Sequence, residues 1–100
     1  REEPIIILAA LSGYFTDLYR AKIGSAARKS YSDAAAAFRY PPNRSFVVKK
    51  AYATAQKLSE GFLEKCLGIL FLTNVSLNSS AADKRTLIEE ALTEISVLPR

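Results

Sequence analysis

The sequence contains no histidine, no methionine and no tryptophan, and it contains only one cysteine. Without histidine the chain lacks the commonest metal ligand and general base of proteins, and a single cysteine excludes an internal disulfide. Cys66 stands among apolar residues, which predicts a buried, inert thiol and not a nucleophile. The sequence also has no glycine-rich phosphate loop and no serine-elbow motif. We therefore predict that the protein is not an enzyme and uses no metal or other cofactor.

Glycine and proline are scarce as well, with 4 of each, whereas 49% of the residues are hydrophobic. Abundant alanine and leucine with little glycine or proline favour helix over other structure. A chain of 100 residues has the size of one compact domain. Its longest apolar runs, residues 5–11 and 66–72, are much shorter than the roughly 20 residues that span a bilayer. We expect a single soluble all-α domain over residues 1–100.

The spacing of apolar residues predicts two helices in the first part of the chain. The first covers residues 4–23, with Pro4 in its first turn and Gly24 as its stop. The second covers residues 25–38, with Ser25 as its N-cap. One bent helix through Gly24 is an alternative that the sequence leaves open.

A third, long helix is predicted after the interruption that Pro41 and Pro42 impose. Asn43 or Ser45 is expected to cap this helix, which continues as one element to about residue 74.

The last helix is predicted to follow a capping box at residues 80–83 and to end at Pro99. Four amphipathic helices joined by short loops favour an up-down antiparallel four-helix bundle. This arrangement is the fold that we expect.

Positive charge is concentrated in the middle of the chain. Residues 21–57 carry eight basic side chains and one acidic one, a net charge of +7, whereas residues 1–20 and 58–100 are slightly negative. An exposed basic face that only keeps the protein soluble would explain this charge. The functional interpretation is docking, with five candidate partner-binding residues near the Pro-Pro loop: Arg39, Tyr40, Arg44, Lys49 and Lys50.

Three classes of partner suit a basic surface: an acidic protein, anionic lipid or nucleic acid. Nucleic acid is disfavoured because no helix-turn-helix, zinc module or stacking motif accompanies the charge. A membrane surface is disfavoured because the basic segment 25–38 offers mainly alanine as its apolar residue. An acidic protein complex is therefore the partner that we predict.

Three tripeptides, which begin at Asn43, Asn74 and Asn78, match the N-glycosylation sequon. Their asparagines and serines are also suited to caps and loops, and we favour this structural role.

Residues 58–63 and 87–98 resemble the last two helices of the PsbQ-type extrinsic lumenal subunits of photosystem II, which include a diatom relative. Tyr31 together with residues 38–40 resembles the Tyr/Arg-rich second helix of that family. The resemblance implies a basic four-helix bundle that docks on the lumenal side of photosystem II and stabilises the oxygen-evolving complex without catalysis. The absence of methionine fits a processed protein of the chloroplast thylakoid lumen, although a trimmed chain would also lack it.

Two alternative functions remain open. A cytosolic helical adaptor would offer a hydrophobic groove to a partner helix, and it predicts an exposed apolar patch around Ile5, Ile6 or Phe71. A basic nucleic-acid accessory protein would bind single or double strands at physiological salt.

Overall fold

The computed structural model describes residues 3–79 and 82–100, and all regular structure in this part of the chain is helical. It comprises α1 (Pro4–Ala26), α2 (Tyr31–Ala37), the 3-10 helix η1 (Pro42–Arg44), α3 (Ser45–Ala55), α4 (Glu60–Ser79) and α5 (Lys84–Ser96). The predicted all-α class is confirmed. A four-helix bundle is not confirmed, because these residues form five α-helices and not four.

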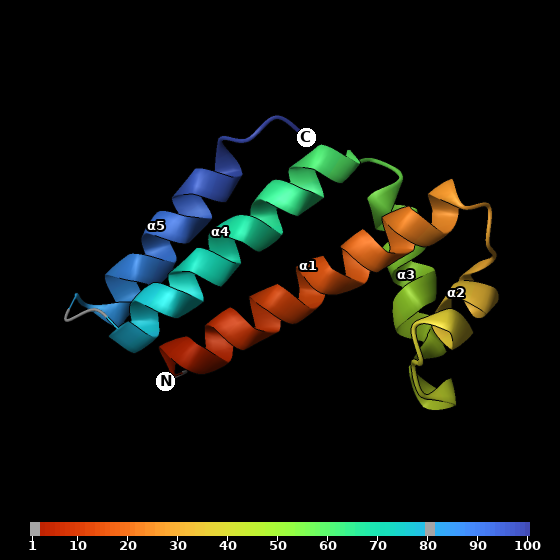
Figure 1. Cartoon of the computed structure of the whole chain (residues 1–100), viewed down its shortest axis with the longest axis horizontal. Helices are drawn as coiled ribbons and strands as arrows, with labels where there is room; N and C mark the ends of the chain where they lie inside the picture. Colours follow the sequence, from red (N-terminus) through yellow and green to blue (C-terminus); the bar gives the residue numbers. More distant parts are fainter. Residues whose placement is uncertain (1–2, 80–81) are drawn as a thin grey trace.

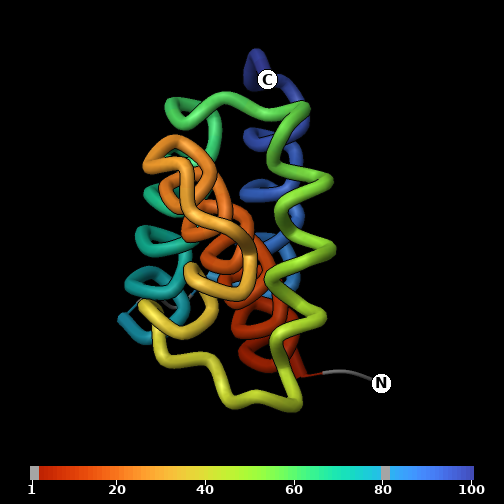
Figure 2. The backbone as a smooth tube through the Cα atoms, turned by 90° about the vertical axis from the view of Figure 1, so that its right-hand side faces the viewer, coloured from red at the N-terminus to blue at the C-terminus, as the bar shows by residue number. Residues whose placement is uncertain are grey.

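Helix α1 is the centre of the molecule and contacts α2, α3, α4 and α5. Helices α4 and α5 lie along α1 in an up-down arrangement, whereas α2 and α3 gather near its C-terminal end (Figure 1). Helices α3 and α4 do not contact each other, although they are consecutive in the chain. Figure 2 shows the connection between them crossing from one side of α1 to the other. The result is a bundle of α1, α4 and α5 with a smaller helical unit packed on one end of α1.

The predicted long third helix is wrong, because the chain breaks between α3 and α4 at residues 56–59. Ser59 caps α4, since its hydroxyl oxygen accepts a hydrogen bond from the Phe62 amide at 3.0 Å. The Ser59 amide donates to the carbonyl of Arg100 at 2.8 Å, so the C-terminal residue helps to fix this turn. The predicted end near residue 74 is also wrong, because α4 continues to Ser79.

The predicted helix over residues 25–38 is wrong in its first part, because α1 passes through Gly24 and ends at Ala26. The end of α1 is closed by Arg28, which has a φ of 62°, and by a hydrogen bond from the Lys29 amide to the Gly24 carbonyl at 2.9 Å. Ser30, not Ser25, caps α2 and accepts from the Asp33 amide at 3.1 Å. The first two helices are therefore separate elements.

Gly24 has a packing role and does not stop the helix. It is buried in α1, and a Cβ at this position would lie 2.5 Å from the Tyr52 hydroxyl oxygen and 3.0 Å from the Ala34 Cβ. The Tyr52 hydroxyl in turn donates to the Lys29 carbonyl at 2.9 Å. The absence of a side chain at residue 24 thus lets α2 and α3 approach the end of α1.

The helix starts in the second half also differ from the predicted caps. Helix α3 has no side-chain cap, and the Ser45 hydroxyl donates instead to the Pro42 carbonyl at 3.2 Å. Asp83 caps α5 by accepting from the Thr86 amide at 3.0 Å, and these contacts lower the pKa of its carboxyl group. Ser80, the first residue of the predicted capping box, lies outside the described residues. Helix α5 ends at Ser96, before Pro99.

The hydrophobic core lies where α1, α4 and α5 meet. Its most completely buried members come from α4 and include Leu63, Cys66 and Leu70, which are at most 1% exposed. The predicted burial of Cys66 is confirmed, and that burial raises the pKa of its thiol. A smaller cluster of Ala34, Ala35 and Val48 joins α2 to α3. None of the helices in the described ranges is long and apolar enough to cross a membrane.

Candidate interaction surfaces

One segment of α1 and one segment of α4 together form a surface without charged side chains. Residues 4–16 of α1 and 66–79 of α4 contain no acidic or basic side chain, and the two helices pack against each other. Besides Tyr14, five large apolar side chains on these segments are between 47% and 66% exposed. We call this set the apolar face: Ile5, Ile6, Phe71, Leu72 and Val75.

A groove of about 400 Å³ opens between α1 and α4 within the apolar face. Ile5 and Phe71 form part of its lining, and Leu8 and Leu70 connect it to the core. The complete lining is Ile5, Leu8, Ala9, Ser12, Leu67, Leu70, Phe71 and Asn74, with no charged side chain. We call this cavity the α1–α4 groove.

Exposed apolar side chains such as Ile5 and Phe71, which line the same groove, cost free energy in water, because burial of apolar surface is worth roughly 25 cal/mol per Å². Soluble proteins therefore seldom keep such a patch unless a partner covers it. The adaptor hypothesis predicts exposed apolar residues around Ile5, Ile6 or Phe71, and this expectation is confirmed for all three. A partner helix is one ligand of the right shape for a groove between two helices.

The basic candidates predicted from the sequence belong to the helical unit at the other end of α1. Arg39, Arg44, Lys49 and Lys50 are all exposed, as expected for residues that meet a partner. Arg39 follows α2 in the left-handed region, with a φ of 63°, where its amide donates to the Ala36 carbonyl at 3.1 Å. Glycine is the usual residue at such a helix end.

Tyr40 differs from the other four candidates because it is half-buried and bonded within the molecule. Its hydroxyl donates a short hydrogen bond to the Asp17 carboxylate of α1, and Arg20 donates to the same hydroxyl at 3.5 Å. Burial raises the pKa of Tyr40, and the hydrogen bond to Asp17 raises it further. The hydroxyl of Tyr40 thus ties the loop after α2 to α1.

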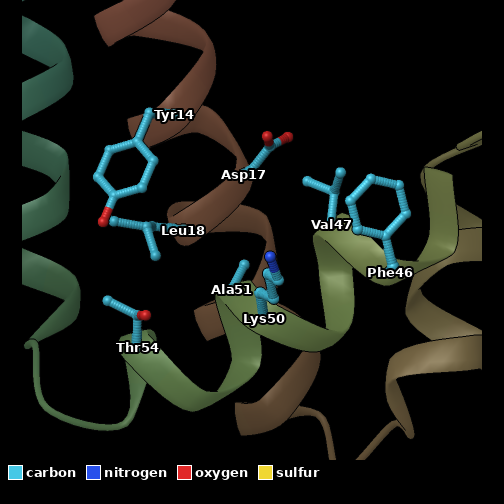
Figure 3. Close-up of a pocket in the computed structure, with 8 residues that line it drawn as sticks. All are labelled: Tyr14, Asp17, Leu18, Phe46, Val47, Lys50, Ala51 and Thr54. Carbon is cyan, nitrogen blue, oxygen red and sulfur yellow. The ribbon is translucent and has the colours of Figure 1, made fainter.

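Lys49 and Lys50 are adjacent in α3 but face different neighbours. The Lys49 ammonium lies 5.7 Å from the centre of the Tyr31 ring on α2. The Lys50 ammonium lies 5.9 Å from the centre of the Phe46 ring, and Lys50 lines a second groove between α3 and α1 (Figure 3). The predicted candidates therefore do not all point toward one ligand.

This second groove, the α1–α3 groove, has a volume of about 280 Å³. Tyr14 and Phe46 stand at its sides and are 54% and 56% exposed. Figure 3 shows the eight residues that line it: Tyr14, Asp17, Leu18, Phe46, Val47, Lys50, Ala51 and Thr54. Tyr14 and Phe46 are absent from the candidates chosen from the sequence, because the choice followed charge alone.

The described ranges contain no cluster of three or more His, Cys, Asp or Glu side chains that could hold a metal ion. Glu64 accepts a hydrogen bond from the Tyr19 hydroxyl at 3.3 Å. The Asn78 side chain donates to the Asn74 carbonyl at 2.9 Å, one turn earlier in α4. These groups have local structural roles.

A family model for the DNA polymerase III delta subunit, C-terminal domain, matches residues 1–95. The match spans almost the whole chain, and the chain belongs to this family. The comparison with curated proteins and the comparison with solved structures each found no match.

The family overturns the resemblance to PsbQ-type subunits, and with it four predictions. The assignments to photosynthesis, to the oxygen-evolving complex, to photosystem II as partner and to the thylakoid lumen are wrong. The resemblance depended on residues 58–63 and 87–98, which repeat leucine and isoleucine at helical spacing. Any helix packed on a core produces such a repeat, so the pattern carries little information on family.

Proposed function

We propose that this chain, whose family is that of the C-terminal domain of the DNA polymerase III delta subunit, is a non-catalytic assembly domain of a DNA replication clamp-loader complex. In this role the apolar face docks on another protein of the complex. The single observation that supports the proposal most strongly is the exposure of Ile5, Phe71 and their neighbours around a groove without charge.

The packing beneath the apolar face supports this assignment. Leu8 and Leu70 are at most 2% exposed and fix α1 against α4, so the side chains above them project from a rigid base. A rigid surface loses little conformational entropy on binding, which favours affinity. A partner that covers Phe71 and Leu72, which are 66% and 64% exposed, would gain apolar burial without having to desolvate any charge of this chain on that face.

The proposal keeps the prediction that the domain is not an enzyme. The chain has no histidine, its one cysteine is buried, and the α1–α4 groove is lined by no acidic or basic side chain. A domain of this composition contributes binding energy and geometry to a complex in which other parts supply any chemistry.

The test replaces Phe71 with glutamate and measures binding of the protein to the remaining subunits of the clamp-loader complex by sedimentation. A charge at the centre of an apolar interface would have to be buried, so we expect affinity to fall at least about tenfold. Val97→Glu is the matched control, because Val97 is apolar and 76% exposed but lies on the C-terminal side of α5, away from the groove. Equal affinities of the two variants would refute the assignment, provided that circular dichroism shows both to be folded.

A further inference from the structure

The α1–α3 groove is separate from the apolar face and is the second concave surface with exposed aromatic walls. We propose that it binds one bulky apolar side chain of an acidic protein segment. This site would give the domain a second partner, independent of the protein that covers the apolar face.

The shape of the groove suits a single apolar side chain. Leu18, Val47 and Ala51 form an aliphatic lining, and Tyr14 and Phe46 stand on either side of it. Its volume of about 280 Å³ is close to the lower limit of small ligand pockets, about 300 Å³. Two half-exposed aromatic rings beside an aliphatic lining match the aromatic anchors found at the centres of protein interfaces.

The charge around the groove selects an acidic partner. Lys50 lines the groove, and residues 21–57, which include α3, have a net charge of +7. The one carboxylate in the lining, that of Asp17, already accepts a hydrogen bond from Tyr40 and lies near Arg20, which donates to the same tyrosine. A carboxylate beside the inserted side chain would therefore meet the Lys50 ammonium.

A nucleic-acid strand fits this surface less well. Lys49 and Lys50 face different sides of α3, whereas the phosphates of a strand need cations along a continuous track. The lining of the groove is also mainly apolar, so it offers few polar groups to the edge of a base. The geometry thus favours a protein segment over a nucleic acid.

The experiment selects peptides from a random phage-displayed library against the protein and then measures the affinity of the most enriched peptide, labelled with fluorescein. We expect enriched sequences to combine several carboxylates with one bulky apolar residue. Phe46→Ala should weaken binding of that peptide at least about tenfold, because Phe46 forms a wall of the groove. Lys50→Glu should weaken it more than Lys49→Glu, since only Lys50 lines the groove.

Several results would overturn the proposal. Enrichment of basic or uncharged peptides, no enrichment at all, or an affinity unchanged by Phe46→Ala would each exclude an acidic segment in this groove. Displacement of the peptide by oligodeoxythymidine at physiological salt would assign the surface to single-stranded DNA instead. Phe71→Ala distinguishes this site from the apolar face, because it should leave peptide binding unchanged even if it impairs assembly of the complex.

Discussion

The two ends of α1 lie in surfaces of opposite character. Residues 4–16 carry no charge and pack beside the uncharged part of α4, whereas Asp17, Arg20 and Lys22 begin a region that continues into α2, the basic loops on either side of it and the basic helix α3. Packing of large aliphatic side chains holds the first region together. The second region has a core of small residues, namely Ala34, Ala35 and Val48, and is held in addition by hydrogen bonds from tyrosines.

This difference shows how a small helical domain can offer two kinds of binding surface. A large aliphatic core supports an exposed apolar face, because the buried layer under it is rigid. A small core leaves the basic end dependent on polar contacts that fix the positions of loops. Each prediction below tests one side of this comparison.

The largest effect is expected in the aliphatic region. Leu70→Ala removes a side chain that is 1% exposed and should lower the free energy of unfolding by about 2–5 kcal/mol. Leu72→Ala on the same helix should change it by less than about 0.5 kcal/mol, because Leu72 is 64% exposed. Urea denaturation of both variants measures the difference, and similar values for the two would contradict the placement of the core.

Replacement of two glycines in α1 by alanine should have smaller effects on the free energy of unfolding, and the two effects should be of opposite sign. Gly24→Ala should destabilise the protein by about 1–3 kcal/mol, because the new Cβ would collide with Tyr52 and Ala34. Gly13→Ala should instead stabilise it by about 0.5–1 kcal/mol, since the new Cβ would meet no atom within 4 Å beyond its chain neighbours and its own turns of the helix, and alanine favours the helix. Thermal unfolding distinguishes the signs, and a stabilising Gly24→Ala would refute the close approach of α2 and α3.

Tyr40→Phe tests the polar contacts of the basic region. The change removes the hydroxyl that binds Asp17 and should cost about 1 kcal/mol of stability. Tyr14→Phe is the control. Tyr14 is 54% exposed, so the loss of its hydroxyl should leave the stability nearly unchanged. Equal stabilities of the two variants would show that Tyr40 does not fix the loop after α2.

The smallest effect concerns the cap of α5 and depends on pH. The hydrogen bonds from Thr86 lower the pKa of Asp83 below its ordinary value of 3.8, so the folded state favours the ionised carboxylate. The stability that it contributes is present above pH 3.8 and is lost as pH falls through the lower pKa of the folded state. Asp83→Asn keeps a capping group but should flatten this part of the acid-unfolding profile, and an unchanged profile would count against the cap.

The sequence was sufficient for features that depend on local pattern. Pro4 in the first turn of the first helix and the burial of Cys66 follow from local pattern, and the structure confirms both. The exposure of Phe71 did not follow from spacing, because residues 68–73 are apolar on almost all sides of the helix, a pattern typical of deep burial. Only the adaptor hypothesis predicted it. The break before Ser59 was not predictable in this way, because it depends partly on a hydrogen bond to Arg100, 41 residues away. Left-handed positions at helix ends were missed because arginine occupies them where glycine is usual.

The candidate site was predictable only in part. The charge of residues 21–57 is a property of the sequence, but the directions of Lys49 and Lys50 depend on which helices flank α3. Similarly, Tyr40 was a candidate for partner binding because it stands among basic residues in the sequence. In the folded chain its hydroxyl donates a hydrogen bond to Asp17 instead. The uncharged segments 4–16 and 66–79 were the signal that pointed most directly to the apolar face.

The salt dependence of assembly tests the central claim most directly, that the apolar face joins this domain to its complex. The affinity of the protein for the remaining clamp-loader subunits is measured between about 0.1 M and 1 M salt, over which the Debye length falls from about 10 Å to about 3 Å. Docking through an uncharged surface predicts an affinity that stays within about threefold across this range, with Phe71→Glu weaker at every concentration. An affinity that falls more than about tenfold with salt and is insensitive to Phe71→Glu would contradict the claim and assign assembly to the basic end.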